Sequence, residues 1–124
     1  MSEFEALGKK VTTPSTKLET FEKPKHIAMV ELETDEVTSL CPVTGQPDWD
    51  KVIVRYIPNK LCIESKSFKL YTWSFREKGT FCETLAETIL EDVWKAAEPH
   101  WCEVLIRQKP RGGVSIEASA IRGD

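Results

Sequence analysis

One amphipathic helix lies between groups of strand-like segments, and this pattern limits most strongly how the chain can fold. Apolar residues recur at every fourth position, at Phe81, Leu85, Ile89 and Val93. They line one face of a helix, which Pro99 ends. That face needs an apolar surface to cover it. A chain of 124 residues has room for one domain, so the neighbouring segments must supply the surface.

Four segments around this helix have the character of strands, because they are rich in β-branched and aromatic residues or alternate between apolar and polar ones. They are residues 28–33, 51–57, 101–107 and 114–120. A short extended segment is predicted at residues 61–64, and a second, shorter helix at residues 67–75. The order strand, strand, helix, helix, strand, strand predicts an α+β fold, with a four-stranded antiparallel sheet and two helices on one of its faces.

Such a sheet has one uncovered face and two open edges, and both are liabilities for a monomer. Pairing the edges of several subunits closes a larger barrel, so we expect a cyclic homo-oligomer. The first 25 residues are polar and contain Pro14 and Pro24. We therefore expect an N-terminal arm at residues 1–25 and a single domain at residues 26–124.

The overall composition argues against two classes of partner. The formal net charge is -3, whereas proteins that bind nucleic acid normally carry a surplus of positive charge. No stretch of about 18 apolar residues is present, which predicts no membrane span. The N-terminal residues lack the apolar core of a signal peptide, so we expect a cytoplasmic protein.

The cysteines and histidines do not form a metal motif. The four cysteines are Cys41, Cys62, Cys82 and Cys102. Because none forms a C-x-x-C pair, a zinc knuckle or a thioredoxin-type motif is disfavoured, and the thiols of a cytosolic protein are expected to be reduced. The two histidines also lie outside any zinc-binding motif, so we predict no metal site.

Residues 40–48, with the sequence LCPVTGQPD, place a thiol and a carboxyl group on either side of a tight turn. Pro42, Gly45 and Pro47 make this turn rigid. A free cysteine is most often a buried packing residue. Cys41, however, is the one cysteine that lies in a polar turn, so its thiolate is a candidate nucleophile.

Asp48 is a candidate general acid, because it follows the same turn as the thiol. Asp50, two residues further on, is the less favoured alternative. The competing interpretation of Asp48 is structural, since aspartate commonly stabilises turns.

Glu83 also allows two interpretations. Together with Thr80 it has the pattern of a capping box, in which the glutamate reaches back to the threonine amide. In the functional interpretation, its carboxylate accepts two parallel N–H groups from a guanine-like edge. The nearby helix N-terminus favours the ionised form that such binding requires.

Lys66, Lys69 and Arg111 are candidates for a phosphate-binding cluster. The alternative is that the two lysines belong to the solvated face of a short helix. The chain contains neither G-x-G-x-x-G nor the P-loop pattern, so a dinucleotide would have to bind by another route.

Four motifs together resemble a known family. They are LCPVTGQPD at residues 40–48, ESKSFKLY at 64–71, SFR at 74–76 and PRGG at 110–113. The chain is similar, over residues 31–116, to the short-chain form of the NADPH-dependent 7-cyano-7-deazaguanine reductases, the QueF family. The resemblance implies the tunnelling fold (T-fold) and a nitrile reductase of queuosine biosynthesis, a tRNA modification. Such an enzyme converts 7-cyano-7-deazaguanine to 7-aminomethyl-7-deazaguanine with two NADPH.

The resemblance also implies roles for individual residues. Cys41 would attack the nitrile carbon to form a covalent thioimide, and Asp48 would protonate the nitrile nitrogen. The substrate-binding residues would be Ile63, Glu64, Ser65, Cys82 and Glu83, and the cofactor-binding residues Lys66, Lys69 and Arg111. Family members assemble as homo-oligomeric rings, usually two stacked together, with the pockets between subunits. The partner would be a small deazapurine, with no direct contact to membrane or nucleic acid.

One position departs from the family pattern. Many relatives have histidine immediately before the base-binding glutamate, and this chain has Cys82 there. A thiol is a poor proton donor at neutral pH, so the histidine's role does not carry over. Two other functions stay open: an amidinotransferase-like enzyme that acts on the deazaguanine nitrile in tRNA, and a non-catalytic ring that binds a purine or pterin.

Overall fold

The period-four apolar stripe forms helix α2, Cys82–Ala97, which packs against one face of an antiparallel sheet. A computed structural model describes residues 16–124, apart from the side chain of Arg111. Leu85, Ile89 and Val93 are buried in the core as the pattern predicts. The stripe's first member, Phe81, lies just before the helix and is 57% exposed.

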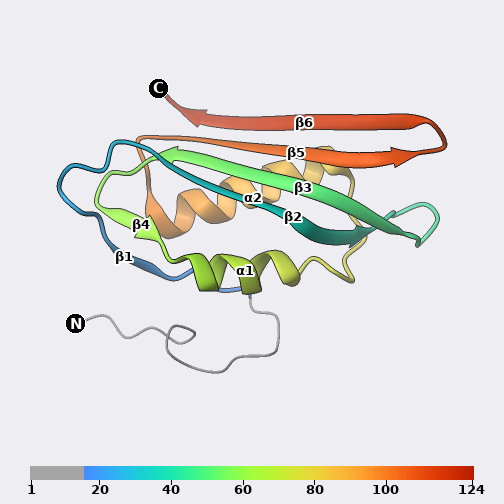
Figure 1. The fold of residues 1–124 in the computed structure, drawn as a ribbon, viewed down its shortest axis with the longest axis horizontal. Helices are drawn as coiled ribbons and strands as arrows, with labels where there is room; N and C mark the ends of the chain where they lie inside the picture. Colours follow the sequence, from blue (N-terminus) through green and yellow to red (C-terminus); the bar gives the residue numbers. More distant parts are fainter. Residues whose placement is uncertain (1–15) are drawn as a thin grey trace.

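The main sheet contains strands β2, β3, β5 and β6 in that order, each antiparallel to its neighbour (Figure 1). Their bounds are Val30–Leu40, Pro47–Ile57, Trp101–Arg111 and Val114–Gly123. The predicted α+β class, with two helices and antiparallel pairing, is confirmed. No helix among residues 16–124 has both the length and the apolar character needed to cross a membrane.

The core lies between the sheet and both helices, the second of which is α1, Ser65–Trp73. Alternate residues of β3 point into it: Val52, Val54 and Tyr56 are fully buried. Because successive side chains of a strand point to opposite faces, the same alternation directs Asp48 and Asp50 inward at the strand's beginning. The inner face of β3 is therefore apolar along most of its length and acidic at one end.

A smaller sheet joins the N-terminal segment to the strand before α1. Strand β1, Thr20–Glu22, pairs antiparallel with β4, Leu61–Ile63. The folded part of the chain therefore begins before residue 26, where the sequence predicts its start. Residues 1–15 of the predicted arm lie outside the described residues.

Several strands are longer than their composition predicts. Strand β2 continues through residues 34–39, which are polar apart from Val37, and contains an irregularity between Thr34 and Val37. Strand β3 begins at Pro47, so Asp48 belongs to a strand rather than to the turn before it. Proline is compatible with the first position of a strand, which explains why β3 can begin at Pro47 itself.

Candidate functional site

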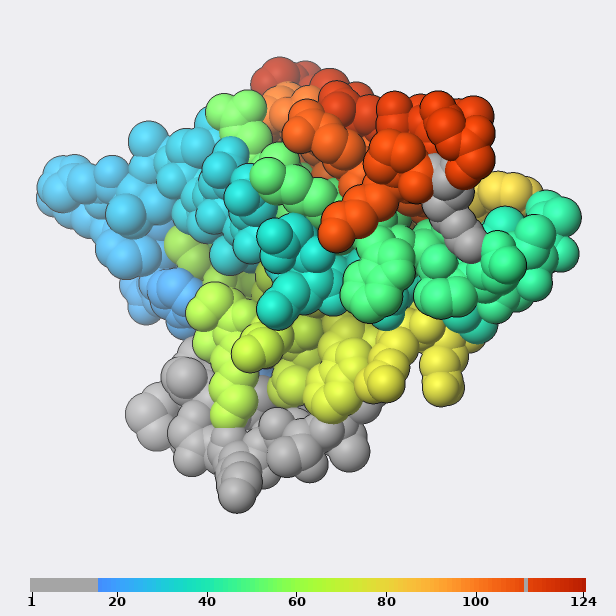
Figure 2. Space-filling view, turned by 45° about the vertical axis from the view of Figure 1, so that its right-hand side comes forward, coloured from blue at the N-terminus to red at the C-terminus, as the bar shows by residue number. Residues whose placement is uncertain are grey.

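The turn of residues 41–46 joins β2 to β3 and places Cys41 at its start. The Cys41 amide donates to the Gln46 carbonyl at 2.8 Å, and the Gly45 amide donates to the Cys41 carbonyl at 2.8 Å. Gly45 has a φ of 73°, in the left-handed region that glycine adopts without a steric penalty. In Figure 2 this turn, coloured teal, lies at the right-hand end of the molecule. Two backbone hydrogen bonds and one glycine thus fix the backbone of the turn that carries the thiol.

The surroundings of Cys41 favour its thiolate. Hydrogen bonds from the Thr44 side chain, the Thr44 amide and the Val43 amide lower the pKa of this thiol, in that order of importance. The other three cysteines are buried. Burial raises the pKa of Cys62, that of Cys82 to about 11 and that of Cys102 to about 12. Cys41 is therefore the thiol of the four that ionises most readily, as a nucleophile requires.

Asp48 is held by strand pairing rather than by the turn itself. It pairs in register with Ser39 of β2, and its side chain is only 5% exposed. Cys41 and Asp48 line the same cavity, whose volume is about 390 Å³. The sequence-predicted nucleophile and acid are thus brought together at one cavity.

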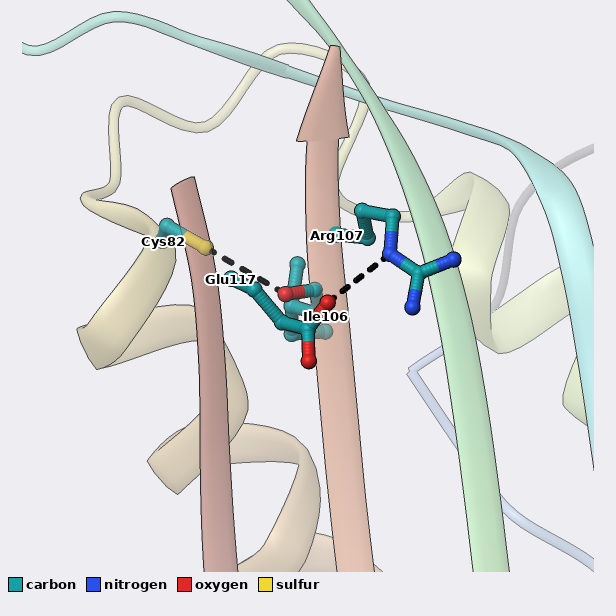
Figure 3. A network of polar contacts seen from close by, with 4 residues as sticks. All are labelled: Cys82, Ile106, Arg107 and Glu117. Atoms are coloured by element: carbon teal, nitrogen blue, oxygen red, sulfur yellow. Dashed lines mark hydrogen bonds and ion pairs between the residues drawn. The ribbon is translucent and has the colours of Figure 1, made fainter. Parts of the chain in front are cut away.

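The N-terminus of α2 forms another wall of this cavity. Cys82 and Glu83, the helix's first two residues, both line it, and so do residues of β5 and β6. Figure 3 shows the Cys82 side chain directed at β5, where its Sγ donates to the Ile106 carbonyl at 3.8 Å. The side chain of the next residue of β5, Arg107, lies on the opposite face of the sheet. Its Nε donates a hydrogen bond to Oε2 of Glu117 at 2.9 Å.

The predicted capping box at this helix is wrong. The N-cap of α2 is Phe81, which makes no side-chain capping bond. The Thr80 amide donates instead to the Leu40 carbonyl at 3.0 Å, because the segment before the helix pairs with the end of β2. The exposed carboxylate of Glu83 therefore lines the cavity and does not close a cap.

Ile63, Glu64 and Ser65 lie apart from the Cys41 cavity, since none of them lines it. The Glu64 carboxylate caps α1, accepting the Lys66 amide with Oε2 and the Ser67 amide with Oε1, both at 2.8 Å. The helix therefore starts two residues before the predicted position. Within this chain, the predicted substrate-binding residues form two separate groups.

The two lysines of α1 line another cavity. Lys66 and Lys69 share a cavity of about 530 Å³ with Trp73 and with Glu36 of β2. Two ammonium groups suit the phosphates of a dinucleotide, and an indole offers a face for stacking. The side chain of Arg111, the third member of the predicted cluster, lies outside the described residues.

A buried polar cluster next to the Cys41 cavity was not predicted from the sequence. Asp50 accepts hydrogen bonds from Ser39 of β2 and Gln108 of β5, and burial raises the pKa of its carboxyl group. The period-two alternation of β3 was a usable signal, because continuing it backwards from Val52 places Asp50 on the inner face. Gln108 carried no signal, since a lone glutamine has no diagnostic spacing.

Comparison with known proteins shows the family to which the chain belongs. The family model described as "QueF-like protein" matches residues 47–123. Among curated relatives, a protein of Syntrophus aciditrophicus is 45% identical over 97% of this chain and 86% of its own length. One of Nitratidesulfovibrio vulgaris is 43% identical over 94% of this chain and 75% of its own length. Both are named NADPH-dependent 7-cyano-7-deazaguanine reductase.

A solved structure is also similar. The archaeosine synthase QueF-Like, crystallised in its apo form, superposes with a TM-score of 0.76 at 31% sequence identity. The match covers 81% of this chain and 98% of that chain.

Proposed function

Since the chain belongs to the QueF-like family, with relatives named NADPH-dependent 7-cyano-7-deazaguanine reductase along nearly its whole length, we propose that it is such a reductase. It converts 7-cyano-7-deazaguanine to 7-aminomethyl-7-deazaguanine in queuosine biosynthesis. The observation that carries this proposal is the cavity shared by Cys41, a thiol of lowered pKa, and the carboxyl group of Asp48.

In the proposed reaction, the Cys41 thiolate attacks the carbon of the nitrile. A carbon–sulfur bond forms, one π bond between carbon and nitrogen breaks, and the nitrogen takes a proton from Asp48. The product is a covalent thioimide. A nitrile is a weak electrophile, so covalent capture divides one difficult step into easier ones. The burial of Asp48 places this proton transfer inside the cavity, away from bulk water.

Glu83 is the proposed anchor for the substrate's pyrimidine edge, where a single carboxylate accepts two N–H groups. Glu83 is exposed on the cavity wall and does not cap α2, and both observations support this role. Cys82 occupies the position of the family histidine. The pKa of its thiol, raised to about 11, keeps it protonated at neutral pH, so it contacts substrate without replacing the histidine as an acid.

NADPH supplies the hydrides for this four-electron reduction, two cofactor molecules for each nitrile. Lys66 and Lys69 would hold its phosphates, with Arg111 as the third cation. The cavity that both lysines line supports this assignment. The chain's own contribution is a pair of lysines three residues apart at the start of α1, a spacing that places both on one side of the helix.

A homo-oligomeric tunnelling-fold ring explains why the predicted residues form two groups. Ile63, Glu64 and Ser65 line no part of the Cys41 cavity of their own subunit. We propose that this segment reaches the substrate of a neighbouring subunit in the closed barrel, and that two rings stack. The proposed substrate is a free small deazapurine, and no direct nucleic acid partner is proposed.

A second candidate function comes from the solved structure of an archaeosine synthase. An enzyme of that kind would use the same thiol and acid without oxidising NADPH. The reductase is favoured because the relatives named as reductases are more similar in sequence and cover more of the chain.

The test is to add 7-cyano-7-deazaguanine and NADPH to the purified protein. We expect the near-ultraviolet absorbance of NADPH to fall, and mass spectrometry without NADPH to detect a covalent adduct. Cys41→Ala should abolish both, whereas Cys62→Ala, a buried cysteine outside the cavity, should keep both. An adduct without NADPH oxidation would favour the synthase. Absence of both would favour a non-catalytic binding ring.

A further inference from the structure

A buried polar cluster lies behind the cavity of Cys41, and the proposed reaction leaves it unused. At its centre is Asp50, which is 1% exposed and points to the same face of β3 as Asp48. Ser39 Oγ donates to Oδ2 of Asp50 at 3.2 Å, and Gln108 Nε2 donates to Oδ1 at 3.0 Å. Each oxygen of this buried carboxyl group therefore has its own donor.

Gln108 connects this cluster to the cavity. It lies on β5 directly opposite Asp50 in the strand register, and its half-buried side chain also lines the cavity. One glutamine thus contacts both a buried carboxyl group and the space where the substrate is proposed to bind. A purely structural partner for Asp50 would not need to lie on the cavity wall.

The chemistry of a carboxamide makes this placement specific. Its nitrogen is only a donor and its oxygen only an acceptor, and they lie on opposite sides of one carbon. Because Asp50 accepts the nitrogen of Gln108, the oxygen is turned away from Asp50. Without a buried acceptor, the amide could rotate and present either atom to the cavity. Asp50 therefore determines that the oxygen of the Gln108 amide, and not its nitrogen, is presented to the cavity.

We propose that Asp50 is a positioning residue that holds the Gln108 amide so that its carbonyl oxygen accepts an N–H group of the substrate. Gln108 is then a specificity-determining contact. This inference rests on the proposed reductase function and names a further residue of its site. A cyano-deazaguanine has N–H groups on both of its rings, and Glu83 takes only those of the pyrimidine edge. The pyrrole N–H remains for a second acceptor.

Three variants test the inference through the steady-state kinetics of the reductase. Gln108→Leu removes the acceptor, and we expect the KM for the nitrile to rise about three- to tenfold, as for one neutral hydrogen bond. The KM for NADPH should change much less than the KM for the nitrile, because the proposed contact of Gln108 is with the nitrile substrate. Gln108→Glu should be poorer still at neutral pH, because two carboxylates would then face each other, and it should improve as the pH falls.

The decisive variant exchanges the two groups. In D50N/Q108E, an amide at position 50 donates to a carboxylate at position 108, which again offers an acceptor oxygen to the cavity. We expect this double variant to recover most of the nitrile affinity that Gln108→Glu loses. Both proteins carry the same substitution at position 108, so the comparison isolates the partner at position 50. A nitrile affinity that recovers by more than the melting temperature does assigns the effect to the acceptor and not to folding alone.

Two results would overturn the inference. One is an unchanged nitrile KM in Gln108→Leu together with a lowered melting temperature, which would make the amide a packing group. The other is a double variant no better than Gln108→Glu, which would mean that the cavity receives no acceptor from position 108. A wild-type protein that oxidises no NADPH would instead refute the reductase function. Calorimetric affinities for the nitrile would then give the same comparison among the variants.

Discussion

The hydroxyl group of Tyr71 on α1 donates a hydrogen bond of 2.6 Å to Oδ2 of Asp92 on α2. Burial, reinforced by the hydrogen bond to Asp92 and by its negative charge, raises the pKa of Tyr71, so the hydroxyl keeps its proton at neutral pH and can donate it to Asp92. The bond joins the two helices that cover the sheet. It also fixes α1, the helix whose first turns carry the predicted cofactor lysines.

Tyr71→Phe should lower the free energy of unfolding by about 1.5–3 kcal/mol, the range for a hydrogen bond to a charged group. The ring would keep its edge-on contact with Phe75, whose centroid lies 5.2 Å away, so the loss reports on the hydroxyl. Urea unfolding of Tyr71→Phe, Asp92→Asn and the double variant measures the coupling. Strictly additive effects would contradict a direct bond between these two side chains.

Thr44→Val should raise the pKa of Cys41, because the threonine side chain is the largest of the contributions that lower it. The rate of adduct formation with the nitrile follows the thiolate fraction, so its midpoint should move to higher pH. Stopped-flow measurements from about pH 5 to 10 give this midpoint; the range brackets ordinary and perturbed thiols. Thr44→Ser keeps the hydroxyl and serves as the matched control. Coincident profiles for valine and wild type would show that the backbone amides alone set the pKa.

Asp48→Asn should bind the nitrile but reduce it slowly. The amide preserves the shape of the buried side chain and removes the acidic proton, so we expect kcat to fall by about 10²–10⁴-fold. Calorimetry should still detect binding of the nitrile, because the contacts of the substrate other than the covalent bond are unchanged. Turnover near the wild-type value would move the acid elsewhere, and Asp50 would be the first residue to test.

Glu83→Ala and Glu64→Ala separate binding from capping. The first should raise the KM for the nitrile most strongly while leaving the melting temperature nearly unchanged, because Glu83 closes no cap. The second should lower stability by about 1 kcal/mol, because it removes the acceptor for two amides at the start of α1. A Glu83→Ala variant that loses stability and keeps its KM would restore the structural interpretation of that residue.

Asp50 should make stability depend on pH in a defined direction. Burial raises the pKa of its folded-state carboxyl group above 3.8, and Asp48 adds to the shift, while hydrogen bonds from Gln108 and Ser39 oppose it. The folded state therefore holds this proton at pH values where the unfolded state has lost it. The resulting stabilisation is complete below 3.8 and is lost as the pH rises through the raised value.

Asp50→Asn removes this contribution. We expect the unfolding free energy of the wild type, minus that of the variant, to fall as the pH increases across that window. Urea titrations at a series of pH values measure this difference. A difference that stays constant or grows with pH would contradict a raised pKa for Asp50.

The sequence predicted the parts of the fold that repeat with a regular period. The spacing of Leu85, Ile89 and Val93 follows a helical surface, and the alternation of residues 51–57 follows a strand, so burial of one face was readable. The turn that holds Cys41 was also predictable, since proline and glycine restrict the backbone locally. In each case the signal lies within a few neighbouring residues.

Features that depend on distant partners were not predictable. The capping-box pattern at Thr80 and Glu83 fails because the Thr80 amide is taken by Leu40, forty residues earlier in the chain. Glu64 is the reverse case: the sequence does not predict that it caps a helix, and its role as the N-cap follows only from the observed start of α1 at Ser65. Local patterns offer hydrogen-bond partners, and tertiary pairing decides which of them are used.

The small sheet formed by β1 and β4 has a practical consequence. Just before β1, the Glu19 carbonyl accepts the Glu64 amide at 2.8 Å, and the Glu19 amide donates to the Ser67 hydroxyl at 2.9 Å. Two hydrogen bonds thus join the amino-terminal segment to the first turn of α1, the helix that carries Lys66 and Lys69. Trimming the chain past Leu18, or fusing a bulky tag there, would loosen that helix and leave the distant thiol turn undisturbed.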